Sequence, residues 1–366
     1  MAGQIIKRGD RKYLVRVYLG EVAGKRKYLN KTINGNKGDA QAYLNKVLRE
    51  RDTESFVEPS KQILKEYLDT WAESTLKARV TEKTYNDYKD RLNWYVKPAL
   101  GDLKLQQIGP EAIQELYNNM LDRGLSPRSV RYTHAVLKNA LQQAVKWGKL
   151  YRNPCDLVDL PKQKKDEMKI LNPDQAAEFM EAVTLSPWKA FFSLLITSGM
   201  RPGEALALRW SSVDFSKNRV TVNRSLVRKR GGGYELQEPK TSRSRRTIPL
   251  PSSTIEDLKE LKEGQKVVKL EGFIFSDKTG EPVHDRTMYK EFKRIIKDAK
   301  LPDLRLYDLR HTCATLLLAA GENPKIVSER LGHANITLTL DTYSHVLPDM
   351  QEAAAEKLEG LLFNGK

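Results

Sequence analysis

Apolar and polar residues alternate along the first part of the chain in a way that predicts β-strands. The alternating runs are residues 5–8, 12–19 and 26–33. Turns between them are predicted at Gly9-Asp10 and near Gly24. A helix follows over about residues 39–51. Three strands and one helix make a small unit, and we expect it to form a first domain over residues 1–55.

The spacing of apolar residues then changes from two to three or four, which is typical of amphipathic helices. The predicted helices cover about residues 60–76, 84–96, 110–123 and 127–147. Ser60 is expected to cap the first of them. The bulky aromatic residues are expected in the core and not stacked on bases: Trp71, Tyr85, Trp94 and Trp147. The pattern predicts a helical second domain over residues 60–160.

A charged run over residues 161–167 predicts a linker to a third domain over residues 169–366. Here helical and strand patterns are mixed. Helices are predicted from Pro173, through Phe191 to Gly199, and over 204–208, 252–264 and 284–300. Strands are predicted within residues 219–250 and at 273–275. The fold class expected for the whole chain is multidomain and mainly α, with a three-stranded sheet at the N-terminus and a small antiparallel sheet in the third domain.

Charge narrows the class of partner. The 366 residues include 63 Lys and Arg against 47 Asp and Glu, which gives a formal net charge of +16. This balance favours a polyanion, nucleic acid first. Two distant cysteines, Cys155 and Cys313, predict no disulfide framework and fit a reducing cytoplasm. The sequence shows no apolar run of about 18 residues and no signal-peptide pattern, so no membrane association is expected.

The candidate chemistry is concentrated between Tyr307 and Tyr343, with Arg201 upstream. Arg201 follows Gly199 at a junction between predicted helices, and Arg310 and His333 lie between the two tyrosines. A phosphodiester under attack gathers negative charge, which guanidinium groups match bidentately. A tyrosine hydroxyl can attack phosphorus and keep the bond as a phosphotyrosine. Such a step conserves the phosphodiester energy, so neither metal nor cofactor is expected.

The motifs resemble those of tyrosine recombinases of the phage integrase family. They are, in order, Ser198-Gly199-Met200-Arg201-Pro202-Gly203-Glu204, Leu309-Arg310-His311-Thr312, Leu331-Gly332-His333 and Tyr343. The resemblance implies that Arg201 and Arg310 hold the scissile phosphate, that His333 contacts it, and that Tyr343 is the nucleophile. It also implies that Lys240, in Pro239-Lys240-Thr241-Ser242, is the general acid for the leaving 5′ oxygen; Lys229 is a weaker alternative, and a plain phosphate contact is another role for Lys240. Glu204 is expected to stabilise a neighbouring turn.

One position departs from the family pattern. The second motif usually begins with His, where this chain has Tyr307. A tyrosine can donate a hydrogen bond to a phosphate oxygen, but with a free pKa near 10 it is a poor proton shuttle at neutral pH. His311 is not expected to replace that histidine, because one residue along a helix turns the side chain by about 100°. Tyr307 remains an alternative nucleophile.

The resemblance also implies DNA-binding roles for the first two domains. The first would bind arm-type sites through its sheet, since a β-ribbon fits the major groove, and the second would bind the core site opposite the catalytic domain. The candidate DNA contacts are Arg11, Lys12, Arg16, Lys25, Arg26, Lys27, Lys77, Arg79, Lys83, Arg128, Arg131, Lys138 and Arg243. Solvated basic faces are the alternative interpretation.

The predicted function is an integrase of a phage or integrative element, acting on double-stranded DNA in a bacterial cytoplasm. Its expected partners are arm and core attachment sites, three further copies in a homotetramer, a directionality factor and a host DNA-bending protein. The tetramer would exchange the amphipathic C-terminal helix, residues 350–363. Two alternatives remain: an enzyme like type IB topoisomerases, with the same chemistry but no strand exchange, and a cleavage-dead DNA-binding regulator.

Overall fold

The computed structural model describes residues 3–22, 24–53, 55–163, 168–229, 232–238, 245–265, 269–343, 355–356 and 358–363. The chain folds as two compact units, Met1–Lys165 and Asp166–Lys366. The first unit contains two separate hydrophobic clusters, one under the N-terminal sheet and one within the helical block. The finer division of this unit into domains at residues 1–55 and 60–160 stays a prediction.

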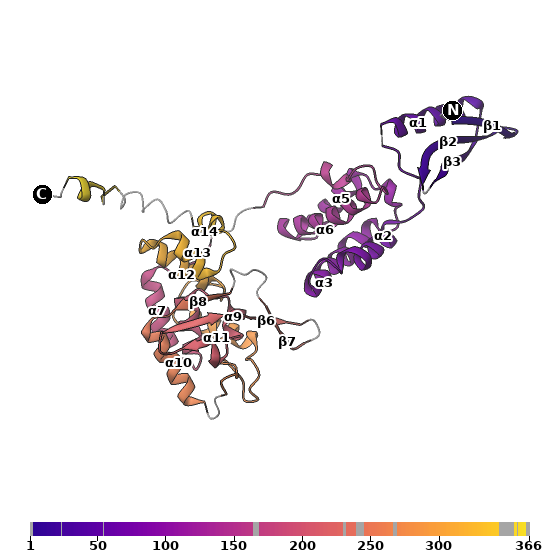
Figure 1. The fold of residues 1–366 in the computed structure, drawn as a ribbon. Helices are drawn as coiled ribbons and strands as arrows, with labels where there is room; N and C mark the ends of the chain where they lie inside the picture. The colour runs from indigo at the N-terminus through magenta and orange to yellow at the C-terminus, as the bar shows by residue number, and fades with distance from the viewer. Residues whose placement is uncertain are drawn as a thin grey trace. The chain divides into compact units, whose positions relative to one another are not determined.

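The N-terminal sheet has the three strands and the helix that the alternation predicts (Figure 1). Its elements are β1 (Gly3–Gly9), β2 (Lys12–Val22), β3 (Lys25–Asn34) and α1 (Lys37–Asp52). The strands pair antiparallel in the order β1-β2-β3. Val15 and Val17 are fully buried in the cluster that also includes Leu44 of α1. Because side chains alternate across a strand, Arg16 lies on the opposite, exposed face, where its guanidinium stands 4.0 Å from the centre of the Tyr28 ring.

The helical block has α-helices interrupted by two single π-turns. Its elements are α2 (Leu64–Trp71), η1 (Ala72–Leu76), α3 (Glu82–Arg91), η2 (Leu92–Val96), α4 (Lys97–Leu100), η3 (Leu105–Gln107), α5 (Pro110–Asp122), α6 (Pro127–Lys146) and η4 (Pro154–Leu157). The prediction that Ser60 caps the first helix was wrong. That helix begins at Leu64, and its N-cap, Ile63, offers no side-chain hydrogen bond, while Ser60 accepts one from the nitrogen of Gln62.

Two of the four aromatic residues expected in the core lie at the surface. Trp71 and Tyr85 are buried, but Trp94 is 59% exposed and Trp147 is 40% exposed. Trp94 lies between Leu92 and Val96, which turn inward and leave it facing outward. Trp147 stands where α6 ends, and its ring packs edge-to-face with that of Tyr67, with 6.0 Å between the ring centres.

The second unit surrounds a large core with helices and two small sheets (Figure 1). Its first part comprises α7 (Pro173–Val183), α8 (Lys189–Ser198), α9 (Pro202–Leu206), η5 (Trp210–Ser212), β4 (Val213–Asp214), β5 (Arg219–Val222), β6 (Ser225–Arg228), β7 (Tyr234–Gln237) and β8 (Arg246–Pro249). It continues with α10 (Ser252–Gly264), α11 (Asp285–Asp298), α12 (Asp308–Ala319), α13 (Pro324–Leu331) and α14 (Ile336–Tyr343). The sheets have the orders β4-β5-β8 and β6-β7, both antiparallel.

The strand predicted at residues 273–275 was wrong. Ile274 and Phe275 are fully buried, as a strand would require. The segment nevertheless makes isolated bridges, Arg209 with Phe273 and Ser276 with Pro282, and no ladder. A short apolar run predicts burial more reliably than it predicts secondary structure. The mainly helical fold class with small antiparallel sheets is confirmed.

Both cysteines are buried and neither is in a disulfide. Among the residues that the structure describes, every helix is too short or too polar to cross a bilayer.

Candidate active site

A sharp turn between α8 and α9 positions Arg201. Gly199 ends α8 with φ 68°, in the left-handed region that favours glycine. A Cβ at this position would lie 2.6 Å from Leu331 Cδ2, so the turn also packs closely against α13. Arg201 is the N-cap of α9, with its side chain 36% exposed. Its backbone nitrogen donates to Glu204 Oε2 at 3.0 Å and its Nη1 donates to Glu204 Oε1 at 2.7 Å.

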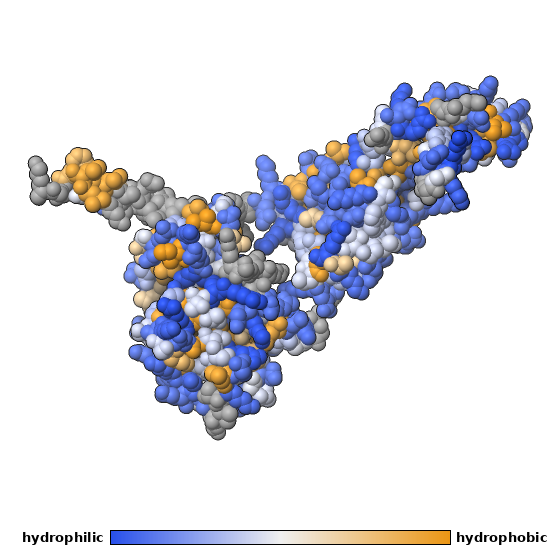
Figure 2. Space-filling view, in the orientation of Figure 1, coloured by the Kyte–Doolittle hydropathy of each residue, from blue (hydrophilic) through white to orange (hydrophobic). Residues whose placement is uncertain are grey.

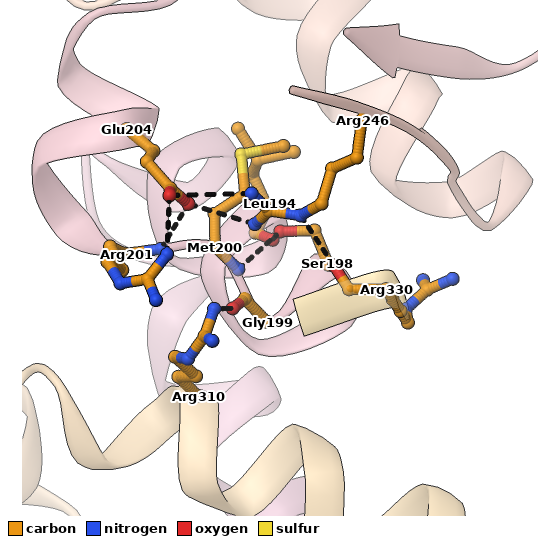
Figure 3. Close-up of polar contacts among 9 residues, drawn as sticks. All are labelled: Leu194, Ser198, Gly199, Met200, Arg201, Glu204, Arg246, Arg310 and Arg330. Carbon is orange, nitrogen blue, oxygen red and sulfur yellow. Dashed lines mark hydrogen bonds and ion pairs between the residues drawn. The ribbon is translucent and has the colours of Figure 1, made fainter. Parts of the chain in front are cut away.

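Glu204 joins Arg201 to a second arginine, Arg246 on β8 (Figure 3). Arg246 Nη2 lies 2.9 Å from Glu204 Oε2, and Arg246 Nε donates to the carbonyl of Arg330 at 2.6 Å. Burial by itself would raise the pKa of Glu204, but the hydrogen bond from Arg246 and the two positive charges outweigh it and lower that pKa. The expected turn-stabilising role of Glu204 therefore agrees with these contacts. Through Arg246 the carboxylate also links the Arg201 turn to the end of α13, two residues before His333.

Replacing this carboxylate should cost much more stability than replacing an exposed one. Glu204→Gln is expected to lower the free energy of unfolding by about 3–5 kcal/mol, because it removes the charge of the buried carboxylate that pairs with the buried guanidinium of Arg246. The matched control is Glu238→Gln, which removes the exposed ion pair with Arg245 and should cost about 0–1 kcal/mol. Urea unfolding at neutral pH measures both. Equal costs would contradict the assignment.

The same variant has an expected pH signature. Because the folded-state pKa of Glu204 is lowered from its ordinary value of 4.5, its stabilisation is complete above that pH and is lost as the pH falls through the depressed pKa. The difference in unfolding free energy between wild type and Glu204→Gln should therefore shrink below pH 4.5.

Arg310 lies in the first turn of α12 and is 1% exposed. Its Nη1 donates to the carbonyl of Gly199 at 2.8 Å (Figure 3). Its Nη2 is buried and has no hydrogen-bond partner among the residues that the structure describes. Burial and the neighbouring charge of Arg201 lower the pKa of Arg310. A buried guanidinium with an unused donor, beside a second guanidinium, is electrostatically suited to receive an anion.

His333 follows α13 at a left-handed glycine, Gly332, whose φ is 68°. Its Nδ1 lies 2.7 Å from the Oγ1 of Thr339, which is fully buried on α14. Burial and the charges of Arg310 and Arg201 lower the pKa of His333 to about 4. His333 is therefore neutral at physiological pH.

Tyr343 ends α14 with its side chain 1% exposed. Its hydroxyl lies 2.9 Å from His311 Nδ1. Burial raises the pKa of Tyr343, although the charge of Arg310 opposes the change. Although His311 was not expected to act in place of a histidine at position 307, its ring lies beside the Tyr343 hydroxyl. Helical rotation does separate His311 from Arg310, but α14 approaches α12 from the side to which His311 turns.

Tyr307 precedes α12 and is 39% exposed. The centre of its ring lies 5.5 Å from that of His311. Tyr307 also interacts with Arg201: both its hydrogen bond and its charge act to raise the pKa of that arginine. The structure thus brings together five of the six predicted catalytic residues, namely Arg201, Tyr307, Arg310, His333 and Tyr343. The sixth, Lys240, lies outside the described residues, as does Arg243.

A cavity of about 720 Å³ adjoins this cluster. Its lining includes Arg245, Arg246, Lys325 and His333. The lining also includes the acidic Glu329, so three cationic side chains stand against one carboxylate and the cavity is positive on balance.

The other twelve candidate DNA contacts are all exposed. Several already have partners: Lys27 pairs with Glu58 at 2.6 Å, and Lys138 pairs with Asp156 at 2.8 Å. Arg131 Nη1 donates to the carbonyl of Pro161 at 3.0 Å. Exposure is necessary for a phosphate contact and does not distinguish it from a solvated face, so these roles stay predictions.

Sequence reasoning missed Arg246, although the strand pattern held a signal for it. Arg246 and Ile248 lie two positions apart on β8 and therefore share a face. Ile248 is a core residue at 1% exposure, and the Arg246 side chain is 6% exposed, while that of Arg245 is 58% exposed. For His311 the local sequence held no such signal, because its partner approaches from another helix.

Comparisons with known proteins agree with this architecture. Residues 169–350 match the model of the phage integrase family, and residues 63–121 match that of the phage integrase N-terminal SAM-like domain. A tyrosine recombinase XerC-like protein of Caldanaerobacter subterraneus is 31% identical over 81% of this chain and 83% of its own. The ICEBs1 integrase of Bacillus subtilis is 28% identical over 76% of this chain and 78% of its own. In three dimensions the chain is similar to the integrase of transposon Tn1549, solved with circular-intermediate DNA, with a TM-score of 0.72, 22% identity, and coverage of 81% of this chain and all of that one, 100%.

Proposed function

The chain belongs to the phage integrase family of tyrosine recombinases, and we propose that it integrates and excises a mobile element by cleaving DNA with Tyr343. The attack forms a 3′-phosphotyrosine, which the 5′-hydroxyl of a partner strand then resolves. The observation that carries this proposal is the position of the Tyr343 hydroxyl in the same cluster as buried Arg310 and half-exposed Arg201. This is the arrangement that phosphoryl transfer to a hydroxyl nucleophile requires.

The two arginines neutralise the charge that develops on the non-bridging oxygens. The Nη2 of Arg310 is a buried donor without a hydrogen-bond partner among the described residues. A phosphate oxygen that accepts from it would therefore be bound favourably. Arg201 is held by Glu204 through backbone and side chain together, so its guanidinium is positioned before DNA arrives.

His333 contributes a neutral hydrogen bond. Nδ1 lies 2.7 Å from Thr339 Oγ1; a hydrogen bond donated by this hydroxyl to Nδ1 would place the ring proton on Nε2, where it can reach a non-bridging oxygen. Tyr307 adds a phenolic donor beside Arg201. Lys240 is proposed as the acid that protonates the leaving 5′ oxygen, with its role inferred from the family motif alone.

The proposed function also implies DNA and protein partners. Double-stranded DNA is the substrate, with the N-terminal sheet on arm sites and the helical block on core sites, in a bacterial cytoplasm. A directionality factor and a host DNA-bending protein complete the proposed assembly.

We further propose that four copies assemble on DNA by exchanging the C-terminal segment. The apolar residues there are strongly exposed: Leu358 57%, Leu361 78%, Leu362 68% and Phe363 78%. Figure 2 shows hydrophobic residues gathered on this segment. Such a patch favours burial against another subunit.

Charged substitutions test the exchange. The double variant Leu361→Asp/Phe363→Asp is expected to bind single-site DNA normally but to lose the tetrameric complex on paired sites, because aspartate opposes burial. Sedimentation of protein–DNA complexes measures both. Wild-type assembly by this variant would contradict the proposal.

The experiment that tests the function is covalent trapping. Wild-type protein is incubated with labelled, nicked duplexes that tile the DNA on either side of its own gene, and products are separated on denaturing gels. Mass spectrometry of the digested adduct should locate the nucleotide on the peptide that contains Tyr343, attached through a 3′ phosphate. Bound DNA without any adduct would contradict cleavage, and relaxation of supercoils without recombination on two-site DNA would favour the topoisomerase-like alternative.

A further inference from the structure

His311 occupies a position that the family motif leaves without a role in this chain. It follows Arg310 on α12, and its Nδ1 lies 2.9 Å from the hydroxyl oxygen of Tyr343, at the far end of α14. The two ring centres are 5.9 Å apart. The contact joins α12 to α14, with α13 between them in the chain. It therefore forms only when the chain is folded. Among the described residues, His311 supplies the imidazole that contacts the Tyr343 hydroxyl.

The reaction needs a proton acceptor at this place. Burial raises the pKa of Tyr343, so its hydroxyl stays protonated at neutral pH and must lose the proton as it attacks. Tyr307, which stands where the family has a histidine, is itself a phenol and cannot accept that proton at neutral pH. His333 is already committed through Nδ1 to Thr339.

We propose that His311 is the general base that accepts the proton of Tyr343 during DNA cleavage. This inference rests on the proposed function, because it assigns a role within the same reaction. His311 touches the reacting oxygen, which makes it a catalytic residue in the strict sense. The proposed base is thus at position 311, after Arg310 in the sequence, whereas the family motif has its histidine at position 307, before Arg310.

The electrostatic surroundings suit an imidazole that is neutral before the reaction. Burial lowers the pKa of His311, Arg310 and Arg305 act in the same direction, and Asp308 opposes them. Tyr343 faces the ring from α14, and His333 is close enough to be influenced by its charge. A neutral ring accepts at Nδ1 and carries its own proton on Nε2. Once the negative phosphorus centre forms nearby, it stabilises the imidazolium.

The proton and bond changes balance without a further reactant. A bond forms between Tyr343 Oη and phosphorus as the bond from phosphorus to the 5′ oxygen breaks. The hydroxyl proton moves to His311 Nδ1, and the 5′ oxygen takes a proton from the general acid. In rejoining, the 5′-hydroxyl of the incoming strand gives its proton to the general acid, which cleavage left in its basic form, and attacks phosphorus. The bond from phosphorus to Tyr343 Oη breaks, and the departing oxygen takes its proton back from the imidazolium.

The decisive variant is His311→Asn. An asparagine amide lies where Nδ1 was and can still accept a hydrogen bond, but it cannot take a proton. Single-turnover cleavage of a nicked duplex is expected to slow by about 10²–10⁴-fold, with DNA binding and thermal unfolding unchanged. His284→Asn is the matched control, because His284 is an exposed N-cap on α11 and asparagine caps equally well. It should cleave like wild type.

The pH profile adds a readout that a structural role would not change. The wild-type rate should fall as the pH drops through the pKa of His311, which burial holds below the ordinary histidine value of about 6.5, because protonated His311 cannot accept a proton. His311→Asn should lack this acidic limb. His333, whose pKa is about 4, is present in both proteins, so its titration does not distinguish them.

A modified leaving group separates the base from the acid. A duplex with sulfur in place of the bridging 5′ oxygen releases a thiolate, which needs no protonation. His311→Asn should remain slow on this substrate, whereas Lys240→Ala should recover. Wild-type or faster cleavage by His311→Asn would overturn the proposal, the faster case indicating that His311 restrains Tyr343. An adduct that is absent, or that is attached to another residue in wild type, would instead overturn the proposed function.

Discussion

Tyr343→Phe is expected to bind DNA as wild type does and to form no covalent protein–DNA adduct. The substitution removes one oxygen atom, the atom that attacks phosphorus, and keeps the ring in its buried site. The lost hydrogen bond to His311 should lower the free energy of unfolding by only about 0.5–1.5 kcal/mol. Denaturing gels measure the adduct, mobility shifts the binding and urea unfolding the stability.

Tyr307→Phe is the matched control for this prediction. Tyr307 lies in the same cluster, with its ring 5.5 Å from that of His311, and it too loses one hydroxyl. It should still form the adduct, at a reduced rate because a donor beside Arg201 is gone. An adduct that persisted in Tyr343→Phe and vanished in Tyr307→Phe would transfer the nucleophile to position 307.

Arg310→Ala is expected to slow cleavage by about 10³–10⁵-fold, by analogy with arginines that stabilise phosphoryl-transfer transition states. In the free protein Arg310 is 1% exposed, and burial together with Arg201 lowers its pKa. Its charge is therefore poorly compensated until a phosphate arrives. The stability of the DNA-free protein should change far less than the cleavage rate does. Thermal unfolding measures the stability, and single-turnover cleavage measures the rate.

Two further variants sharpen this test. Arg310→Lys keeps the charge but loses the planar pair of donors, so it should recover only part of the rate. Arg219→Ala removes an exposed arginine on β5 and should leave cleavage unchanged. Cleavage by Arg310→Ala within about tenfold of wild type would exclude a transition-state role.

Local patterns predicted most of the secondary structure because they act over a few residues. Alternation identified β1, β2 and β3, and helical spacing identified α5 and α6 of the first unit and α8, α10 and α11 of the second. The same patterns failed where local signals are ambiguous. Trp94 and Trp147 were expected in the core, yet both are exposed, because the helix face that is buried depends on which neighbours pack against it.

The sequence by itself determined the chemical groups of the site and their order along the chain. Short-range conformational preferences specify the glycine turns and the helix ends at which these groups lie. Arg201 and His333 come after glycine turns, Arg310 lies at the start of a helix, and Tyr343 lies at the end of one. Such preferences are properties of neighbouring residues and can be read without the fold.

Only the tertiary structure decided which of these groups touch. The hydrogen bond between His311 and Tyr343 spans 32 positions, and that between Arg246 and the carbonyl of Arg330 spans 84. Both depend on how α12, α13, α14 and β8 pack around one core. Packing is set by many weak contacts between distant residues, so a neutral imidazole beside the nucleophile and a carboxylate shared by two arginines could not be derived from spacing along the chain.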